Sequence, residues 1–272
     1  MMRLSERLRR LVLVLAVVLI ATSGALAADR LILATTTSTE NSGLLGYLLP
    51  VFEERFNVRV DVIAVGTGKA LELGKNGDAD VLLVHDRKSE DAFVADGFGV
   101  NRRDVMYNDY IILGPPSDPA GVGKAKSAVE ALTIIAEAKA PFISRGDDSG
   151  THKKEMSIWK EANIEPEAPW YMAAGQGMGP CINIADEQNG YVLSDRGTYI
   201  SYKNKTELVI IYEGDEIMFN PYGVIAVNPD LHPHVNYEQA MNFVEFLTSS
   251  EGRALIESYK MEGEQLFYLY SN

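Results

Sequence analysis

The sequence predicts an α/β protein made of two doubly wound α/β lobes that are joined by two crossover strands. Two observations carry this prediction. Short apolar strands alternate with helical patterns along the 272 residues, which is typical of mostly parallel sheets covered by helices on both faces. Two longer extended runs, near positions 110 and 222, interrupt the alternation. We predict that these runs pass from one lobe to the other.

The first part of the chain contains three strand–loop–helix units. Strands are predicted at residues 31–34, 58–65 and 81–84. After the first strand, leucines at positions 44, 45, 48 and 49 recur with Phe52 at helical spacing. Pro50 is expected to kink this helix. A short helix is expected near residues 70–73.

The second part repeats the pattern after a proline-rich turn at residues 115–119. Ser127 and Glu130 form a capping-box pattern for a helix that ends near Lys139. Strands are predicted at residues 107–114, 142–144, 170–173, 191–193, 208–212 and 218–228, and further helices at 152–160, 237–247 and 251–259.

The two crossover runs make the first lobe discontinuous. Residues 28–110 and 224–272 are predicted to form lobe 1, and residues 111–223 to form an inserted lobe 2. Two α/β lobes on paired crossover strands form a hinge that can close on a ligand. One continuous doubly wound sheet is the alternative arrangement.

Residues 1–27 have the pattern of a secretory signal. Four arginines and Glu6 precede an apolar run at residues 11–21, and Ala25-Leu26-Ala27 is a typical cleavage motif. The apolar run is short for a membrane span, so a signal anchor is the weaker alternative. We expect cleavage after about Ala27 and a periplasmic or equivalent extracytoplasmic location.

The charge balance argues against nucleic acid as a partner. The chain has a net charge of −13, and removal of the arginine-rich signal makes it more negative. An anionic ligand must therefore be held by local donors. Cys181 is the single cysteine, so an intramolecular disulfide is excluded. We expect a monomer in which Cys181 packs as a small buried group.

Three polar loops follow predicted strands and precede predicted helices. They are Thr35–Ser38, Gly66–Gly68 and the turn Ser144–Thr151. Ligands of open α/β sheets lie at the carboxyl ends of strands, and the N–H groups that start a helix lack partners inside it. For the third loop, a capped helix with a solvated arginine is the simpler alternative.

These loops offer hydrogen-bond donors and one fixed positive charge. Oxyanions accept hydrogen bonds, so a site for a small oxyanion needs donors. Arg145 supplies the charged planar fork, and Asp147 or Asp148 is expected to orient it. The expected binding residues are Thr36, Thr37, Ser38, Thr67, Gly68, Arg145, Ser149, Gly150, Thr151, Gln176 and Gly177.

Some polar residues have competing interpretations. Gln176 and Gly177 belong to a loop after a strand, and a plain turn is their alternative. Ser194 and Thr198 also lie near a strand end, and we expect a structural role more than binding there. His85 is expected to satisfy a strand terminus. His232 and His234 fit a surface turn, because no partner cluster supports a metal site.

Four segments together resemble the periplasmic tungstate-binding proteins of bacterial tungstate ABC importers. They are Leu33–Ser38, Val65–Ala70, Asp78–His85 and Ser144–His152. The resemblance covers essentially the whole chain after the signal. It implies the two-lobed periplasmic-binding-protein fold of type II, tungstate or molybdate as the ligand, and delivery to a membrane permease. It implies neither catalysis nor a cofactor.

Other functions remain open on the sequence. Arg145 with Ser149-Gly150-Thr151 also resembles a segment of phosphate-binding proteins. Phosphate carries a proton near neutral pH and needs an acceptor, whereas the first two loops contain no acidic residue. A secreted serine hydrolase could pair Ser149 with His152, but the G-x-S-x-G elbow is missing. The sensing domain of a regulator would not be exported.

Overall fold

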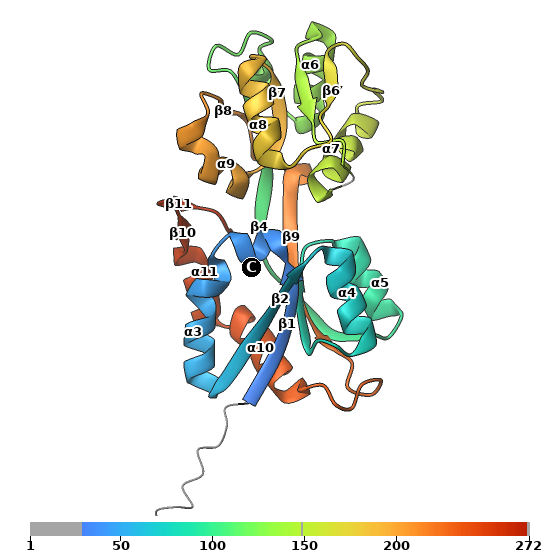
Figure 1. Ribbon diagram of the computed structural model, residues 1–272, viewed down its shortest axis with the longest axis vertical. Helices are drawn as coiled ribbons and strands as arrows, with labels where there is room; N and C mark the ends of the chain where they lie inside the picture. Colours follow the sequence, from blue (N-terminus) through green and yellow to red (C-terminus); the bar gives the residue numbers. More distant parts are fainter. Residues whose placement is uncertain (1–28, 148, 271–272) are drawn as a thin grey trace, which may run out of the picture.

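The computed structural model describes residues 29–147 and 149–270. The predicted signal at residues 1–27 and Asp148 lie outside the described residues. Figure 1 shows two halves, one above the other. We call residues 29–109 and 219–270 the lower half, and residues 110–218 the upper half.

The lower half is built on three parallel strands. β1 pairs with β2 on one side and with β3 on the other. The strands are β1 (Asp29–Thr36), β2 (Val58–Val65) and β3 (Val81–Val84). The helices are α2 (Thr37–Asn41), α3 (Leu44–Phe56), α4 (Thr67–Asn76), α5 (Arg87–Ala95), α10 (Tyr237–Thr248) and α11 (Ser250–Ser258).

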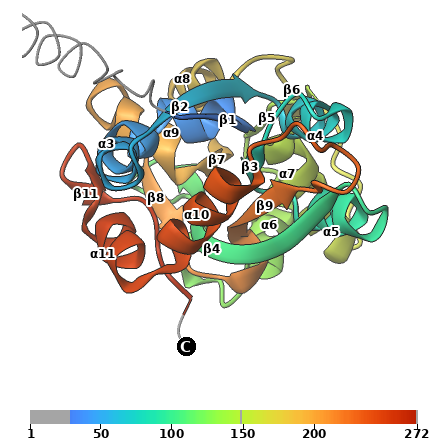
Figure 2. The same cartoon turned by 90° about the horizontal axis from the view of Figure 1, so that it is seen from below.

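Helices cover both faces of the lower sheet. The leucine face of α3 packs with Phe243 of α10 and with Leu31 in one buried cluster. Ala70 of α4 and Phe93 of α5 belong to a second cluster. Figure 2, from below, shows α3 and α11 apart from α4 and α5, with α10 between them. Each fully buried leucine or phenylalanine contributes about 1.5–3 kcal/mol. α3 continues through Pro50.

The upper half repeats this layered arrangement. β5 pairs in parallel with β6 and with β7. The strands are β5 (Phe142–Ser144), β6 (Tyr171–Ala173), β7 (Tyr191–Asp195) and β8 (Val209–Tyr212). The helices are α6 (Ala128–Ala138), α7 (Gly150–Glu161), α8 (Met178–Glu187) and α9 (Arg196–Tyr202), with short 3-10 turns at Val122–Lys124, Lys203–Lys205 and Glu216–Met218. Ser127 caps α6, as predicted.

Two antiparallel strands connect the halves, as Figure 1 shows. β4 (Gly99–Gly114) pairs with β9 (Phe219–Val227) up to Asp109, and from Tyr110 onward it pairs with β7. All these strands therefore form one hydrogen-bonded sheet, in the order β2-β1-β3-β9-β4-β7-β5-β6, with β8 beside β4. The predicted lobe boundaries at residues 110 and 224 fall inside β4 and β9.

β4 begins earlier than the sequence pattern predicted, at Gly99 instead of Tyr107. Charged residues in its first part break the apolar pattern by which a strand is predicted from the sequence. Arg102 is almost fully buried and donates to the carboxylate of Glu90, which has no exposed surface. A strand that packs charged groups against a neighbouring helix lacks the apolar alternation on which the prediction relied.

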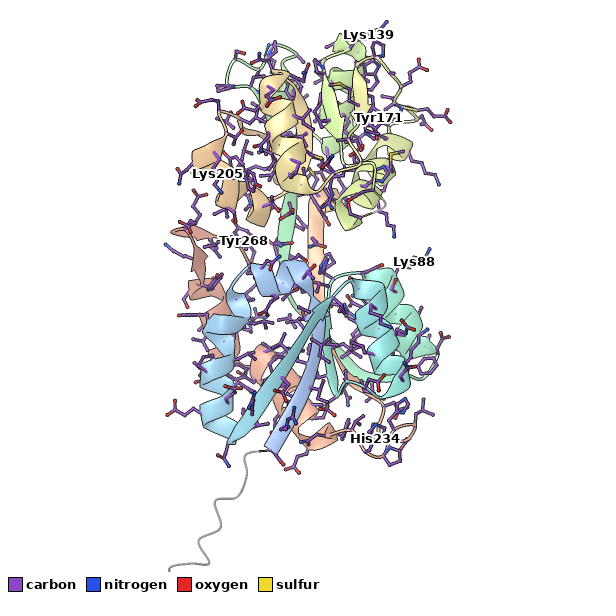
Figure 3. All side chains as sticks on the ribbon, in the orientation of Figure 1. Lys88, Lys139, Tyr171, Lys205, His234 and Tyr268 are labelled. Carbon is purple, nitrogen blue, oxygen red and sulfur yellow. The ribbon has the colours of Figure 1, made fainter. Side chains whose placement is uncertain are left out.

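The C-terminal segment makes a further contact between the halves. β10 (Lys260–Met261) and β11 (Glu264–Gln265) form a hairpin, and Glu264 forms an ion pair with Lys203 of the upper half. Tyr268 then exchanges two backbone hydrogen bonds with Tyr107 of β4. Figure 3 labels Tyr268 beside the connecting strands. Every helix among the described residues is too short or too polar to cross a membrane.

Replacing Gly223 of β9 with alanine should destabilise the protein. A Cβ there would overlap Oε2 of Glu90 and lie 2.9 Å from Nη2 of Arg102, so the buried ion pair must shift. We expect a loss of about 1–3 kcal/mol of unfolding free energy, measured by urea denaturation. Gly46→Ala is the matched control, because this exposed glycine of α3 has no atom within 4 Å of a new Cβ; it should gain up to ~1 kcal/mol. Equal effects of the two variants would contradict this account.

Candidate functional site

A cavity of about 550 Å³ lies between the two halves. Residues of both halves, both connecting strands and the C-terminal segment line it. The lining residues are Thr36, Thr37, Ser38, Asn41, Ser42, Val65, Gly66, Thr67, His85, Asn108, Tyr110, Arg145, Ser149, Gly150, Thr151, Asp195, Gly197, Thr198, Ser201, Tyr202, Asn220, Tyr222, Met261 and Leu266.

The lower wall is formed where β1 and β2 end and helices begin. Thr36 is the N-cap of α2, and its hydroxyl accepts a hydrogen bond of 3.2 Å from the N–H of Thr39. Gly66 is the extended N-cap of α4 and has no side chain to cap it. The early N–H groups of α4 are therefore free of a side-chain cap. The wall presents hydroxyl groups and helix-starting N–H groups to the cavity.

The upper wall is formed by the turn between β5 and α7. Arg145 follows β5 directly, and Ser149 is the N-cap of α7, where its hydroxyl accepts from the N–H of His152 at 3.2 Å. Gly146 has φ +60°, and a Cβ there would lie 2.8 Å from the Cβ of Ala173. Only glycine suits this left-handed, crowded position. The turn brings Arg145 and the start of α7 to the same side of the cavity.

Asp147 holds the guanidinium of Arg145. Oδ2 of Asp147 accepts from Nη2 at 2.6 Å and from Nε at 3.1 Å. Burial by itself would raise the pKa of Asp147, but hydrogen bonds from Ser149 and Arg145 outweigh it and lower the pKa. The carboxylate is thus ionised at neutral pH. Nη1 of Arg145 donates to neither oxygen of Asp147.

A buried carboxylate supports the same turn. Glu155 of α7 accepts hydrogen bonds from Ser144 (2.8 Å), Tyr171 (2.8 Å) and the indole of Trp159 (3.2 Å). Burial raises its pKa, and these three donors oppose that shift. Because Ser144 precedes Arg145, Glu155 fixes the end of β5 from which the arginine projects.

The charges in the cavity wall are few. Of the described lining residues, Arg145 is the only permanent cation and Asp195 is the only carboxylate. Asp195 caps α9: its two oxygens accept from the N–H and the hydroxyl of Thr198, each at 2.8 Å. The wall therefore combines many neutral donors with one cation, and its single carboxylate already has two donors.

Eight of the eleven predicted binding residues line this cavity. They are Thr36, Thr37, Ser38, Thr67, Arg145, Ser149, Gly150 and Thr151. Gly68, Gln176 and Gly177 do not line it. Gln176 and Gly177 are exposed and lead into α8, of which Gly177 is the N-cap. Their binding role stays a prediction.

The sequence interpretation missed the polar residues of the connecting strands. Asn108 of β4 and Asn220 of β9 face each other in register and line the cavity. His85 lines it as well, although we expected only a strand terminus there. A usable signal existed, because Asn108 and Asn220 interrupt long apolar runs. Buried amides in such positions need partners and often mark a site.

Other candidates are structural. Ser194 is buried and its hydroxyl donates to the backbone of Asp195. His232 and His234 contact the backbone oxygens of Lys75 and Gly77 at the end of α4, and Figure 3 shows His234 at the base of the lower half. Within residues 29–147 and 149–270, no cluster of metal-ligating side chains is found. Cys181 is buried, and burial raises its pKa to about 11.

Comparisons with known proteins agree with this geometry. The family described as "PBP superfamily domain" matches residues 21–251. The tungstate-binding protein TupA of Peptoclostridium acidaminophilum is 51% identical over 241 residues, covering 87% of this chain and 84% of that protein. A solved structure of the tungstate ABC transporter from Geobacter sulfurreducens is 58% identical, with a TM-score of 0.75 over 86% of this chain and 100% of that one. A solved structure of the tungstate-binding protein TupA from Desulfovibrio alaskensis G20 is 46% identical, with a TM-score of 0.85 over 90% of this chain and 100% of that one.

The fold and the interlobe site define a solute-binding protein of the PBP superfamily. Within that superfamily, the chain belongs to the family of tungstate-binding proteins that includes TupA. The resemblance and fold class predicted from the sequence are confirmed. The prediction of a binding protein, and not an enzyme, is confirmed by the same relatives.

Replacing the N-cap Ser149 with alanine should destabilise α7, because the N–H of His152 loses its acceptor. We expect a loss of about 1 kcal/mol in unfolding free energy, measured by urea denaturation. Ser127→Ala, which removes the equivalent cap of α6 away from the cavity, should cost a similar amount. No measurable loss in Ser149→Ala would mean that this hydroxyl does not cap the helix.

Proposed function

We propose that this chain is an extracytoplasmic receptor that binds a tetrahedral oxyanion between its two halves and passes it to the permease of an ABC importer. Tungstate is the proposed ligand, and molybdate is a close second because it has the same charge and shape. The relatives named tungstate-binding proteins support this ligand. The signal-like residues 1–27 support a periplasmic location with cleavage after about Ala27. We expect a monomer that binds no nucleic acid.

The opposed walls of the cavity carry this proposal. Donors of the lower half (Thr36, Thr37, Ser38 and Thr67) lie across one cavity from donors of the upper half (Ser149, Gly150 and Thr151). Arg145 adds the fixed charge, and Asp147 orients it. A dianion without protons can accept from all of these groups, whereas a cationic or apolar solute could satisfy few of them.

The donor set is sufficient for tight binding. A hydrogen bond to a charged group contributes about 1.5–3 kcal/mol. After ordering and desolvation costs, several such bonds can reach the ~12 kcal/mol that corresponds to nanomolar affinity. The strongly acidic chain does not prevent this, because low local dielectric makes nearby donors outweigh distant surface charge.

The size of the cavity suggests that the two halves close on the ligand. An anion with four oxygens occupies about the volume of three to four waters, ~100 Å³, which is far less than the 550 Å³ between the walls. Closure around β4 and β9 would bring donors of both halves to the same anion, so the anion stabilises the closed form. Gly68, Gln176 and Gly177 are proposed to approach the ligand only then.

Phosphate is the second candidate, and Asp195 is the observation that favours it. A carboxylate in the wall could accept the proton that phosphate retains at neutral pH. Each of its oxygens already accepts one hydrogen bond from Thr198 and keeps a second lone pair. The relatives named tungstate-binding proteins support the fully deprotonated anions, so we place these first.

Titration calorimetry with tungstate, molybdate, sulfate and phosphate at one ionic strength tests the ligand. We expect tungstate and molybdate to bind at least 100-fold more tightly than phosphate, because neither brings a proton into a wall of donors. Tighter binding of phosphate than of tungstate would overturn the assignment.

Arg145→Ala should weaken tungstate binding by about 2–3 kcal/mol, because it removes the fixed charge of the wall. Arg145→Lys keeps the charge but loses the planar fork, so discrimination between anions should change more than affinity. Arg87→Ala is the control, since this exposed arginine of α5 pairs with Asp91 and Asp104 outside the cavity wall. An effect of Arg145→Ala below about tenfold (~1.4 kcal/mol) would make Arg145 a structural partner of Asp147 only.

A further inference from the structure

His85 connects the cavity hydroxyls to the two connecting strands. Its Nε2 lies 3.1 Å from Oγ of Ser38 and 3.1 Å from Oγ1 of Thr36. Its Nδ1 lies 3.1 Å from Oδ1 of Asn220, and its ring packs on Tyr222 with centroids 4.8 Å apart. This imidazole is not among the groups proposed to bind the anion.

A chain of amides determines which imidazole nitrogen carries the proton. Nδ2 of Asn220 donates to Oδ1 of Asn108 at 2.8 Å, and Nδ2 of Asn108 donates to the hydroxyl of Tyr222 at 3.3 Å. Oδ1 of Asn220 therefore faces His85 and can only accept. Nδ1 of His85 is the donor, which leaves Nε2 of the neutral ring as an acceptor.

This acceptor competes with an anion for hydroxyl protons. Thr36 and Ser38 have one hydroxyl proton each, and their oxygens lie 3.0 Å apart. Oγ1 of Thr36 also lies 2.6 Å from Oγ1 of Thr39, whose hydroxyl can donate to it. While the imidazole is neutral, the hydroxyl proton of Thr36 or of Ser38 points to Nε2 of His85. An anion that only accepts hydrogen bonds needs that proton, and its withdrawal would leave Nε2 without a donor.

We propose that binding of the dianion is accompanied by uptake of one proton at Nε2 of His85, an inference that rests on the proposed function. The proton comes from solvent, and one N–H bond forms. The imidazolium then donates to one of the hydroxyl oxygens of Thr36 and Ser38, so the proton that had pointed to Nε2 turns to the anion. His85 is a positioning residue that acts through these two hydroxyls.

The charges around His85 suit such a change. Burial lowers the pKa of His85, which keeps the ring neutral without an anion, while Asp86 and Asp195 act in the opposite direction. The phenol of Tyr222 packs on the imidazole, and the phenol of Tyr110 lines the same cavity. Burial raises the pKa of both phenols, so they stay uncharged. Arg145 is the cation of the opposite wall. Two negative charges on the ligand add to the two aspartates and favour the imidazolium.

The test is the pH dependence of tungstate binding, measured by calorimetry between pH 7.0 and 8.5. One linked proton strengthens binding up to tenfold per pH unit as the pH falls. At pH 7.0, binding heats in two buffers of different ionisation enthalpy should report uptake of up to one proton. His85→Asn can still donate to Asn220 but cannot be protonated, so its affinity should be nearly independent of pH. His232→Gln, which removes a histidine remote from the cavity, should behave as the unchanged protein.

The outcomes separate this inference from the proposed function. Absence of any tungstate binding overturns the proposed function and this inference with it. Tungstate binding with equal heats in both buffers, or with the same proton uptake in His85→Asn, overturns this inference alone. Should His85→Asn not fold, nitrogen NMR of the four histidines in the unchanged protein decides the matter. We expect a neutral His85 with its proton on Nδ1 before tungstate and a doubly protonated ring after it; a ring that stays neutral contradicts the inference.

Discussion

The antiparallel pairing of β4 with β9 holds the two halves of the molecule together. These strands are central in the sheet, and each half of the molecule builds its parallel strands outward from them. β4 changes its partner from β9 to β7 between Asp109 and Tyr110. The facing pair Asn108 and Asn220 lies next to this change, so the point where the halves meet is also a wall of the cavity.

The site follows from the way each half ends its strands. Parallel strands place their carboxyl ends at one edge of a sheet, and the helices that follow begin there with unpaired N–H groups. Two such edges face each other across the cavity. Charged side chains at the turn of Arg145 have partners in the protein. Asp147 binds the guanidinium of Arg145, and Glu155 accepts three hydrogen bonds, one of them from the residue before Arg145. The guanidinium of Arg145 is therefore held in place by the protein, which would reduce the ordering cost of binding the proposed anion.

The C-terminal segment adds a constraint that the two strands alone do not provide. It pairs with β4 at Tyr268, lines the cavity with Leu266 and reaches the upper half through Glu264. The Tyr107 ring stacks on Phe219 and Tyr268, with centroids 4.5 and 5.6 Å apart. The C-terminal segment therefore joins the two halves beside the connecting strands.

Local sequence patterns predicted most of the strands and eight of the residues that line the cavity, but not the helices α5, α8 and α9. Strands such as Val58–Val65 and Phe142–Ser144 were predicted with their observed bounds, because apolar runs between turn signals are a local property. Thr36, Thr67 and Arg145 were predicted because they follow strands. The remaining features arise from contacts between distant parts of the chain. The start of β4 was not predicted, because Arg102 is charged and is neutralised only by Glu90 of α5. The contacts of Asn220 with His85 and with Asn108 join residues more than a hundred positions apart. Such pairings arise from strand register, which local patterns do not encode.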